Sequence, residues 1–256
     1  MPSLSAHQSS KVTKLMLIGN SGSGKTGALV SLVKAGYKLH ILDFDNGLDS
    51  LTYLIKSTCP DKLPNVDFVT LRDKFKASPM GPVVDGMPTA FVDGLKLLDK
   101  WEDGSIPGKL GPEHIVVIDS LTFLSESAFN WATALNPAAK DKRQIYGAAM
   151  DAIENAIALL TSSNFATNVI VISHIKFIDQ PDGTTKGYPT SIGNALSPKL
   201  PAFFNHVALC ETVGNKRQLR IQSSGLVDLK STVAFKLAPT LPIETALADF
   251  FAEVRK

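Results

Sequence analysis

The stretch that decides the fold lies near the N-terminus and reads Gly19-Asn20-Ser21-Gly22-Ser23-Gly24-Lys25-Thr26. It fits the pattern G-x-x-x-x-G-K-[ST], in which glycines let the backbone wrap closely around a phosphate. Lys25 would reach the β- and γ-phosphates of a nucleotide, and the Thr26 hydroxyl would bind Mg²⁺. The apolar run at 15–18 predicts a buried strand before the loop, and residues 27–33 predict a helix after it. A turn that is merely rich in Gly and Ser would not need a strand before it and a helix after it. We therefore expect all eight residues to form a nucleotide-binding P-loop.

Length and composition are those of an ordinary globular protein. The chain has 256 residues, of which 44% are hydrophobic and 20% charged, and its net charge is +2. This charge neither requires nor excludes nucleic acid, so any DNA contact must come from a local patch. Cys59 and Cys210 form neither a metal-ligand spacing nor a disulfide framework, which favours a reducing compartment. No apolar run approaches the roughly 18 residues of a membrane span, so we expect no membrane association.

Strands and helices are predicted to alternate along the chain. Apolar runs predict strands at 38–45, 66–69, 115–119 and 169–172, and helical spacing predicts helices at 48–56, 89–101 and 142–162. A strand pair follows at 202–212 and 217–222. This order predicts an α/β fold with a mainly parallel central sheet flanked by helices. We expect residues 12–256 to form a single domain and the Ser-rich residues 1–11 to be a disordered tail.

A P-loop needs a second acid to hold magnesium, and Asp119 is the candidate. It ends the nearly pure apolar run Ile115-Val116-Val117-Ile118, which is typical of a buried parallel strand. The alternative is an acid that only caps the following helix. Beside a P-loop, we predict that Asp119 and Thr26 are the metal-binding residues.

Hydrolysis also needs a group that positions or deprotonates water. Asp43 and Asp45 lie two residues apart at the end of the strand predicted over 38–45, and therefore on one face of it. The carboxyl ends of parallel strands border the ligand site in such folds. We predict Asp45 as the catalytic base and Asp43 as a second candidate, against the alternative of solvated turn acids.

His174 directly follows the strand predicted over 169–172 and Ser173. A polar residue at this point can sense the γ-phosphate and transmit its loss to the next loop. The alternative is a structural histidine that hydrogen-bonds to the backbone. We predict that His174 completes the catalytic group with Lys25, Asp45 and Asp119.

Several segments together resemble the RecA family. Residues 41–49, Ile-Leu-Asp-Phe-Asp-Asn-Gly-Leu-Asp, resemble the family segment hydrophobic-hydrophobic-Asp-x-Glu-x-x-Leu-Asp, whose catalytic Glu corresponds here to the shorter Asp45. Residues 116–120 resemble the Walker B strand with its following Ser. Gly193-Asn194-Ala195-Leu196 resembles the tetrapeptide that closes the second DNA-binding loop of bacterial RecA. The resemblance covers most of the chain and implies a RecA-like P-loop ATPase core, most similar to the small phage-type RecA-like ATPases of single-strand annealing and recombination.

The resemblance also implies two DNA-binding loops, at 135–146 and 175–193. Their candidate contacts are Lys140, Lys142 and Arg143 in the first loop, and Lys176, Phe177, Lys186 and Tyr188 in the second. Cations that follow phosphates and rings that stack on bases suit single-stranded DNA. The alternative is that these are ordinary polar loops, because nearby aspartates dilute their positive charge.

RecA-like ATPases assemble so that a basic residue of a neighbour completes the ATP site, and the resemblance therefore implies a homo-oligomeric ring or filament. A cation placed on the transferring phosphate stabilises its developing charge. Lys230 and Lys236 match this role by position only, and the alternative is a pair of surface lysines. The oligomerisation helix and C-terminal domain of the family have no recognisable counterpart, which favours an accessory or annealing ATPase over a strand-exchange recombinase.

Together these features predict a Mg²⁺-dependent enzyme that hydrolyses ATP to ADP and phosphate and acts on single-stranded DNA in recombination, annealing or replication. The expected setting is the cytoplasm of a bacterium or phage-infected host cell, with a single-strand-binding or replication protein as a further partner. One alternative is a RecA-like switch acting on a protein, such as a helicase loader or a clock- or partition-type switch. Another is a regulatory module with little hydrolysis, because Asp replaces Glu at position 45. A small-molecule kinase is disfavoured, since only five of the 26 basic residues are arginines.

Overall fold

The computed structural model describes residues 11–139 and 141–256 and is built around an eight-stranded sheet. The order of its strands is β12-β11-β10-β1-β7-β6-β2-β3. The strands are β1 (Lys14–Gly19), β2 (Lys38–Asp43), β3 (Val66–Thr70), β6 (His114–Asp119), β7 (Asn168–Ser173), β10 (His206–Val213), β11 (Lys216–Arg220) and β12 (Thr240–Pro242). Neighbours from β10 to β3 are parallel, whereas β11 and β12 extend one edge of the sheet in antiparallel fashion.

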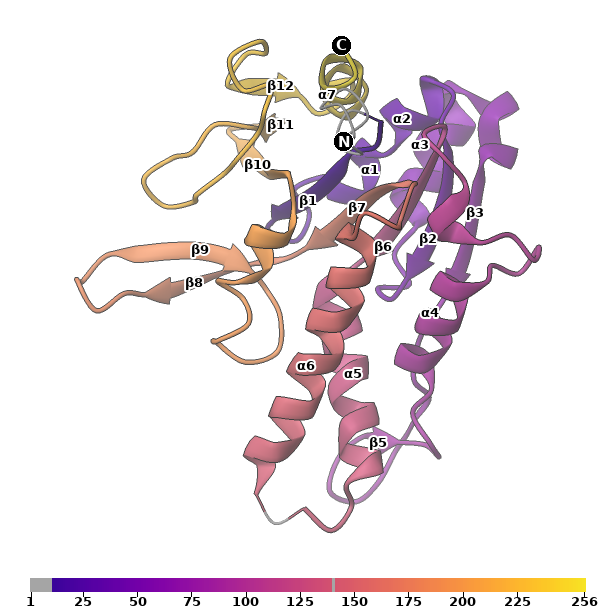
Figure 1. Cartoon of the computed structure of the whole chain (residues 1–256), viewed down its shortest axis with the longest axis vertical. Coiled ribbons are helices and arrows are strands. Elements are labelled where there is room, and N and C mark those ends of the chain that lie inside the picture. Colours follow the sequence, from indigo (N-terminus) through magenta and orange to yellow (C-terminus); the bar gives the residue numbers. More distant parts are fainter. Residues whose placement is uncertain (1–10, 140) are drawn as a thin grey trace, which may run out of the picture.

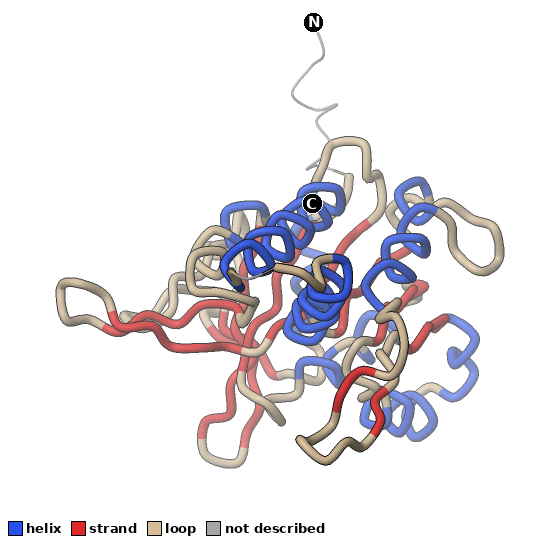
Figure 2. Tube along the Cα trace, turned by 90° about the horizontal axis from the view of Figure 1, so that it is seen from below, coloured by secondary structure: helices blue, strands red, loops and turns tan. Residues whose placement is uncertain are grey.

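Helices cover both faces of this sheet, as Figures 1 and 2 show. One face packs against α4 (Ala90–Asp99), α5 (Leu121–Leu135) and α6 (Lys142–Thr161). The other face packs against α1 (Lys25–Ala28), α2 (Val30–Lys34), α3 (Asp49–Thr58) and α7 (Ala246–Val254). Short 3₁₀ helices cover Pro60–Asn65, Pro107–Lys109 and Leu200–Phe203. The predicted α/β fold with a mainly parallel central sheet flanked by helices is confirmed.

The apolar strands are continuous because both of their faces are buried. Along β1, Leu15 and Leu17 pack toward the α1, α2, α3 and α7 side, whereas Met16 and Ile18 pack toward the α4, α5 and α6 side. This alternation follows from the two-residue period of a strand. Burial on both faces accounts for the unbroken apolar runs from which these strands were predicted.

β2 ends at Asp43, two residues earlier than the sequence predicts. The amides of Phe44 and Asp45 both donate to the carbonyl oxygen of Asp119, at 2.6 and 3.1 Å. The chain therefore leaves the strand direction and turns toward the end of β6. Asp43 and Asp45 do not share one strand face, which corrects the expectation drawn from alternation.

The segment expected to be the second DNA-binding loop contains a β-hairpin. β8 (Ile175–Asp179) and β9 (Thr185–Pro189) form an antiparallel pair that projects from the body of the molecule (Figure 1). At its tip, the Asp182 carboxylate accepts from the amide and hydroxyl of Thr184, at 3.0 and 2.7 Å. Gly183 has φ 82°, a value that favours glycine in a tight turn.

A second, smaller hairpin follows β3. It consists of β4 (Phe75–Lys76) and β5 (Val83–Val84), which pair in antiparallel fashion. Among the helices that the structure describes, none combines the length and the apolar character needed to cross a membrane.

Candidate nucleotide site

The P-loop connects β1 to α1 at the carboxyl edge of the parallel sheet. β1 is buried throughout and ends at Gly19, where a Cβ atom would collide with the carbonyl oxygen of Cys210 on β10. Gly24, the residue before α1, has φ 94°, which side chains rarely tolerate. Backbone crowding and backbone conformation thus explain two of the glycines of the motif.

Lys25 is folded back onto the loop that precedes it. Its Nζ donates to the carbonyl oxygens of Gly19 and Asn20, at 3.0 and 2.8 Å. Burial lowers the pKa of Lys25, and the nearby carboxyl groups of Asp119 and Asp45 partly oppose that shift. The ammonium group is therefore held at the loop by weak carbonyl acceptors, and an anion bound there would be a stronger partner.

The side chains of Thr26 and Asp119 contact each other beside the P-loop. The Thr26 hydroxyl donates to Oδ2 of Asp119 at 2.7 Å, although β6 is separated from β1 by β7. Burial raises the pKa of Asp119 to about 7, and the charges of Asp45 and Asp43 add to the rise. A hydroxyl and a carboxylate oxygen in a cluster of acids are hard donors that suit Mg²⁺. These residues fit the metal expected from the sequence.

The carboxylates of Asp45 and Asp43 have different hydrogen-bond partners. Oδ1 of Asp45 accepts from both the amide and the hydroxyl of Ser120, at 2.9 and 2.7 Å. Asp43 instead accepts from the hydroxyl of Thr70 at 3.1 Å and from the amide of Gly47 at 3.3 Å, and burial raises its pKa. Asp45 thus lies beside the Walker B end of β6, whereas Asp43 ties the end of β2 to β3 and to its own turn.

His174 lies between the nucleotide site and the projecting hairpin. It separates β7 from β8, and its carbonyl oxygen accepts from the amide of Thr190 beyond β9, at 2.7 Å. Burial lowers the pKa of His174, with a further lowering from the charge of Lys25. The structure therefore brings His174 into electrostatic reach of Lys25 and directly onto the base of the hairpin.

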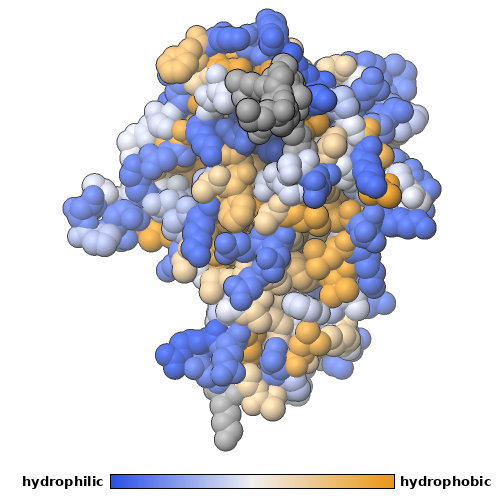
Figure 3. Space-filling view, viewed as in Figure 1, coloured by the Kyte–Doolittle hydropathy of each residue, from blue (hydrophilic) through white to orange (hydrophobic). Residues whose placement is uncertain are grey.

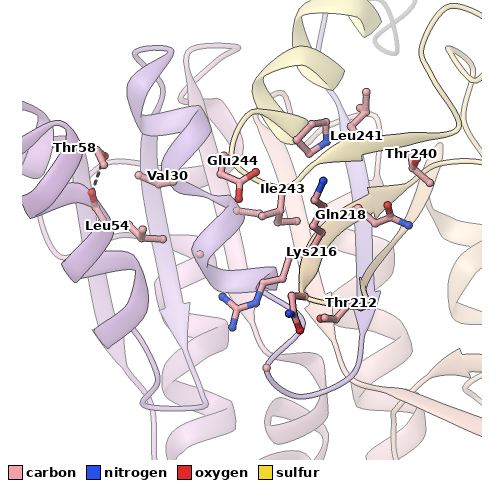
Figure 4. A pocket seen from close by; sticks show the side chains of 18 of the residues that line it. Val30, Leu54, Thr58, Thr212, Lys216, Gln218, Thr240, Leu241, Ile243 and Glu244 are labelled. Carbon is pink, nitrogen blue, oxygen red and sulfur yellow. Dashed lines mark hydrogen bonds between the residues drawn. The ribbon is translucent and has the colours of Figure 1, made fainter.

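A large cavity borders the P-loop on the side of β11 and β12. Its volume is about 1000 Å³, and it is lined by Gly22 and Gly24 of the loop together with residues of α2, α3 and the 212–218 and 240–244 segments. Figure 4 shows Leu54 and Val30 on the helical side, facing Ile243 and Glu244 across it. The lining combines apolar side chains with polar and charged ones, and a concave site of this size can hold a small molecule.

Arg217 is a residue of this cavity that the sequence analysis missed. It lies on β11, far along the chain from the P-loop, and lines the cavity with Gly24. No motif marks it. The only signal in the sequence is its place two residues before Leu219 on an amphipathic strand, which puts both side chains on one face.

The cations predicted in the second DNA-binding loop already have partners within the chain. Lys176 donates to the carbonyl oxygens of Ser191 and Gly193, at 3.2 and 2.9 Å. Lys186 forms an ion pair with Asp228 at 3.0 Å. Tyr188 lies opposite Lys176 in the hairpin ladder. Lys176 thus fastens the base of the hairpin to the segment that carries Gly193.

The first predicted DNA-binding loop is the connection between α5 and α6, which lies far from the hairpin tip in Figures 1 and 2. Lys142 and Arg143 begin α6, and Arg143 forms an ion pair with Asp141 at 2.9 Å. Lys140 lies outside the residues that the structure describes. The two sets of predicted contacts are therefore on separate projections of the molecule.

The remaining predicted residues do not line the cavity beside the P-loop. In the tetrapeptide at 193–196, Leu196 is buried in the core, and a Cβ on Gly193 would lie 2.9 Å from the sulfur of Met150. Lys230 is exposed and pairs through its backbone with Val207, and Lys236 lies 3.7 Å from Glu253. Neither lysine lines the cavity beside the P-loop.

Comparisons with known proteins agree with this fold. A family model described as an AAA domain matches residues 11–233, and no curated protein sequence is significantly similar. The RadB recombinase is similar in structure at 15% identity, with 84% of each chain covered and a TM-score of 0.46. A prototypical ATPase from the type III secretion system of pathogenic bacteria has 10% identity, 93% of this chain and 61% of its own covered, and a TM-score of 0.50. The ATP synthase subunit NeqB from Nanoarcheaum equitans has 10% identity, 89% and 54% covered, and a TM-score of 0.45.

At these identities a structural likeness concerns the fold alone, and the likeness to the secretion ATPase agrees with the fold of a RecA-like P-loop NTPase core. The chain covers about three fifths of the secretion ATPase and about half of the ATP synthase subunit.

Proposed function

The chain belongs to the AAA domain family, and we propose that it is a Mg²⁺-dependent ATPase that acts on single-stranded DNA in recombination, annealing or replication. The observation that carries the proposal is the 2.7 Å hydrogen bond between Thr26 and Asp119 behind the P-loop, with Asp45 fixed on Ser120 beside it. A placement with the small phage-type RecA-like ATPases is part of this proposal. The proposal also includes that residues 12–256 form a single domain.

In this proposal the eight residues Gly19 to Thr26 hold the phosphates of ATP. Lys25 leaves the carbonyl oxygens of Gly19 and Asn20 and donates to the β- and γ-phosphates, because anionic oxygens are stronger acceptors. Thr26 and Asp119 hold Mg²⁺, which when bound neutralises charge that develops on the phosphates. Because a metal ion would bind a lone pair of the Thr26 oxygen, the hydroxyl proton could still be donated to Asp119.

Asp45 acts on the attacking water. Its carboxylate accepts a proton from the water while the water oxygen bonds to the γ-phosphorus, and the bond from that phosphorus to the bridging oxygen breaks to release ADP. The products are ADP, inorganic phosphate and the proton. Ser120 donates to only one carboxylate oxygen of Asp45, Oδ1, so Oδ2 remains available for water.

His174 couples the loss of phosphate to the hairpin. Its backbone is bonded to Thr190, and the hydroxyl of Ser173 donates to the carbonyl oxygens of His174 and Thr190, at 2.9 and 3.1 Å. A movement of His174 on loss of the γ-phosphate would therefore reach both ends of the hairpin at once.

The DNA half of the proposal rests on the projecting hairpin and on the start of α6. Phe177 on β8 is 52% exposed, and a solvent-facing ring among cations suits stacking on unpaired bases. Lys142 and Arg143, together with Lys140, which lies outside the described residues, would contact phosphates. Lys176 and Lys186 would contribute on release from Ser191, Gly193 and Asp228.

A homo-oligomer, either a ring or a filament, belongs to the same proposal. Lys230 and Lys236 are exposed and do not line the cavity of their own chain, so the role proposed for either is at the site of a neighbouring copy. A single-strand-binding or replication protein is the expected further partner.

The test is the rate of ATP hydrolysis with no DNA, with a single-stranded oligonucleotide and with a duplex, read beside the mass in solution. We expect turnover that requires Mg²⁺, is lost in Lys25→Ala and rises several-fold with single strands only. Turnover that stays constant across a titration of oligonucleotide would contradict the DNA half. Turnover that is equal in Lys25→Ala and the wild type would contradict the ATPase half.

A switch that acts on a protein partner is the second candidate, and a specific observation favours it. Three of the predicted DNA-contacting cations, Lys176, Lys186 and Arg143, are engaged within the chain. Figure 3 shows that apolar areas interrupt the hydrophilic surface of the face it displays. DNA-independent turnover together with a stable complex with a replication protein would select this candidate.

A further inference from the structure

The Arg217 side chain lies against the P-loop of its own chain. A Cβ atom built on Gly24 would lie 3.0 Å from Cδ and 3.8 Å from Nε of Arg217. Gly24 immediately precedes Lys25 and has the φ of 94° that glycine supplies. The guanidinium group therefore stands beside the loop that holds the phosphates in the proposed function.

The strand that carries Arg217 is firmly anchored. Two residues further along β11, Leu219 is fully buried in the cluster formed by α1, α2, α3 and α7, so the alternation of the strand directs Arg217 to the same side. On the opposite face, Arg220 and Gln218 both donate to Glu211, at 2.8 and 2.7 Å. The Arg217 carbonyl also accepts from the amide of Ile243 at 3.3 Å.

The charge of Arg217 has no internal counterpart. Its side chain is exposed, and among the residues that the structure describes it has neither a hydrogen-bond nor an ion-pair partner. Arg220, on the same strand, is by contrast bound to Glu211 at 2.6 Å. An unpaired guanidinium group is planar and presents parallel N–H donors, a geometry that matches phosphate oxygens.

The cavity extends from this point to receive the rest of a nucleotide. The cavity has a volume of about 1000 Å³. It begins at Gly22 and Gly24 and continues between Leu54 and Ile243 (Figure 4). Apolar side chains on two sides suit a base, and the polar side chains of the 212–218 and 240–244 segments suit a sugar. Arg217 lines this cavity next to Gly24, so it lies where the P-loop and the cavity adjoin.

We propose that Arg217 binds the phosphate chain of the nucleotide in cis, as a second cation beside Lys25. This inference rests on the proposed function of the P-loop as a nucleotide site. It adds a binding residue that comes from β11 of the same chain, separate from any lysine that a neighbouring copy supplies. A contact with phosphate acts on every nucleotide alike, whatever its base.

The test compares the binding of ADP and of GDP by titration calorimetry, each with Mg²⁺. Arg217→Ala should weaken both nucleotides by a similar factor, about tenfold or more, since a charge-assisted hydrogen bond is lost. Arg217→Lys should recover part of the lost affinity, because lysine keeps the positive charge but lacks the two parallel N–H donors of the guanidinium group. Lys199→Ala, which removes an exposed cation 3.9 Å from Glu154 and outside the cavity, should bind as the wild type does.

The outcomes separate this inference from the function on which it rests. Wild-type affinity in Arg217→Ala, with binding lost in Lys25→Ala, would overturn the role of Arg217 and leave the P-loop site intact. Absence of binding to the wild type would overturn the nucleotide site itself. A loss confined to one of the two nucleotides would overturn the phosphate contact in favour of a base contact.

A mixture of the two variants tests whether the contact is in cis. If Arg217 and Lys25 act on the same nucleotide within one chain, mixing Arg217→Ala with Lys25→Ala creates no complete site. Binding should then equal the average of the two proteins measured separately. The appearance of tight sites in the mixture would show an arginine acting across copies and overturn the cis assignment.

Discussion

At the scale of single residues, each carboxylate of the site is distinguished by its hydrogen-bond partner. Asp119 is joined to Thr26, Asp45 to Ser120, and Asp43 to Thr70. Asp43 and Asp119 end two adjacent strands and Asp45 lies two residues after the first of them, yet their hydrogen bonds separate the three acids into a metal position, a water position and a structural position. Only Asp119 and Asp45 act on the metal or the water in the proposed mechanism.

Substitution of Asp45 tests this division. We expect Asp45→Asn to lower turnover by about 10²-fold or more, because general-base catalysis contributes roughly that much, while nucleotide binding persists. Asp43→Asn should mainly lower stability, since it weakens the bonds to Thr70 and Gly47. Single-turnover hydrolysis and thermal melting, measured on both variants, distinguish the two roles. The assignment is wrong if Asp43→Asn loses turnover and Asp45→Asn keeps it.

Asp45→Glu addresses the alternative of a regulatory module with little hydrolysis. The longer side chain would bring the carboxylate one methylene closer to the γ-phosphate side. A wild type that is nearly inactive and a variant that turns over ATP would favour the regulatory module. Equal or lower turnover in the variant would favour Asp45 as the base that this chain uses.

At the scale of elements, the β8–β9 hairpin is the part of the molecule most directly connected to the site. Lys176 fastens its base to Ser191 and Gly193, and His174 precedes it without an intervening loop. Close packing maintains the ladder, since a Cβ on Gly187 would lie 2.8 Å from Ile175 and 3.1 Å from Phe177. The hairpin can therefore respond as one unit to a shift at its base.

Removal of the exposed ring on this hairpin should weaken DNA binding selectively. We expect Phe177→Ala to reduce affinity for single-stranded DNA about tenfold, since stacking on one base contributes roughly 1–3 kcal/mol. Basal ATP turnover should stay unchanged. Phe68→Ala is the matched control, because Phe68 is 55% exposed on β3 at the far edge of the sheet. Equal losses in the two variants, by fluorescence anisotropy, would argue against a role for the hairpin.

The elements also show what the sequence can and cannot predict. The central strands were predictable because burial on both faces leaves unbroken apolar runs, and the P-loop and Asp119 because they flank such strands. The end of β2 was not predictable, since it depends on two hydrogen bonds to the Asp119 carbonyl oxygen. The β8–β9 hairpin and Arg217 were missed for a related reason. Their positions follow from strand pairing, which local patterns do not encode.

At the scale of the whole molecule, the last elements complete the face that carries the P-loop. Phe250 and Phe251 of α7 are fully buried in the same cluster as Leu29 and Leu32, which follow the loop. The hydroxyl of Ser31 accepts from the amide of Ala248 at 3.2 Å. The segment after residue 233, where the family match ends, thus supports the nucleotide site and is part of one core.

This core contains a histidine that should make the fold sensitive to acid. His206 on β10 is 3% exposed and meets the ring of Phe250 edge-on, with centroids 5.2 Å apart. Burial lowers its pKa from 6.5 to about 4. The folded protein therefore keeps His206 neutral, whereas the unfolded chain takes up a proton below pH 6.5. Stability that is present above that pH is lost as the pH falls toward 4.

The expected contribution of His206 between pH 7 and pH 5 is a loss of about 2 kcal/mol. The lowered pKa of His40 acts in the same direction, whereas the raised pKa of Asp119, about 7, acts in the opposite direction, so the contribution of His206 is read from the difference between the wild type and a variant. Urea unfolding at the two pH values measures the difference. His206→Asn removes the titrating group, so its stability should fall less than that of the wild type over this range, whatever its stability at pH 7. The same decrease in both proteins would show that His206 is not the source, because only a group that binds its proton differently in the folded and unfolded chains can tilt stability with pH.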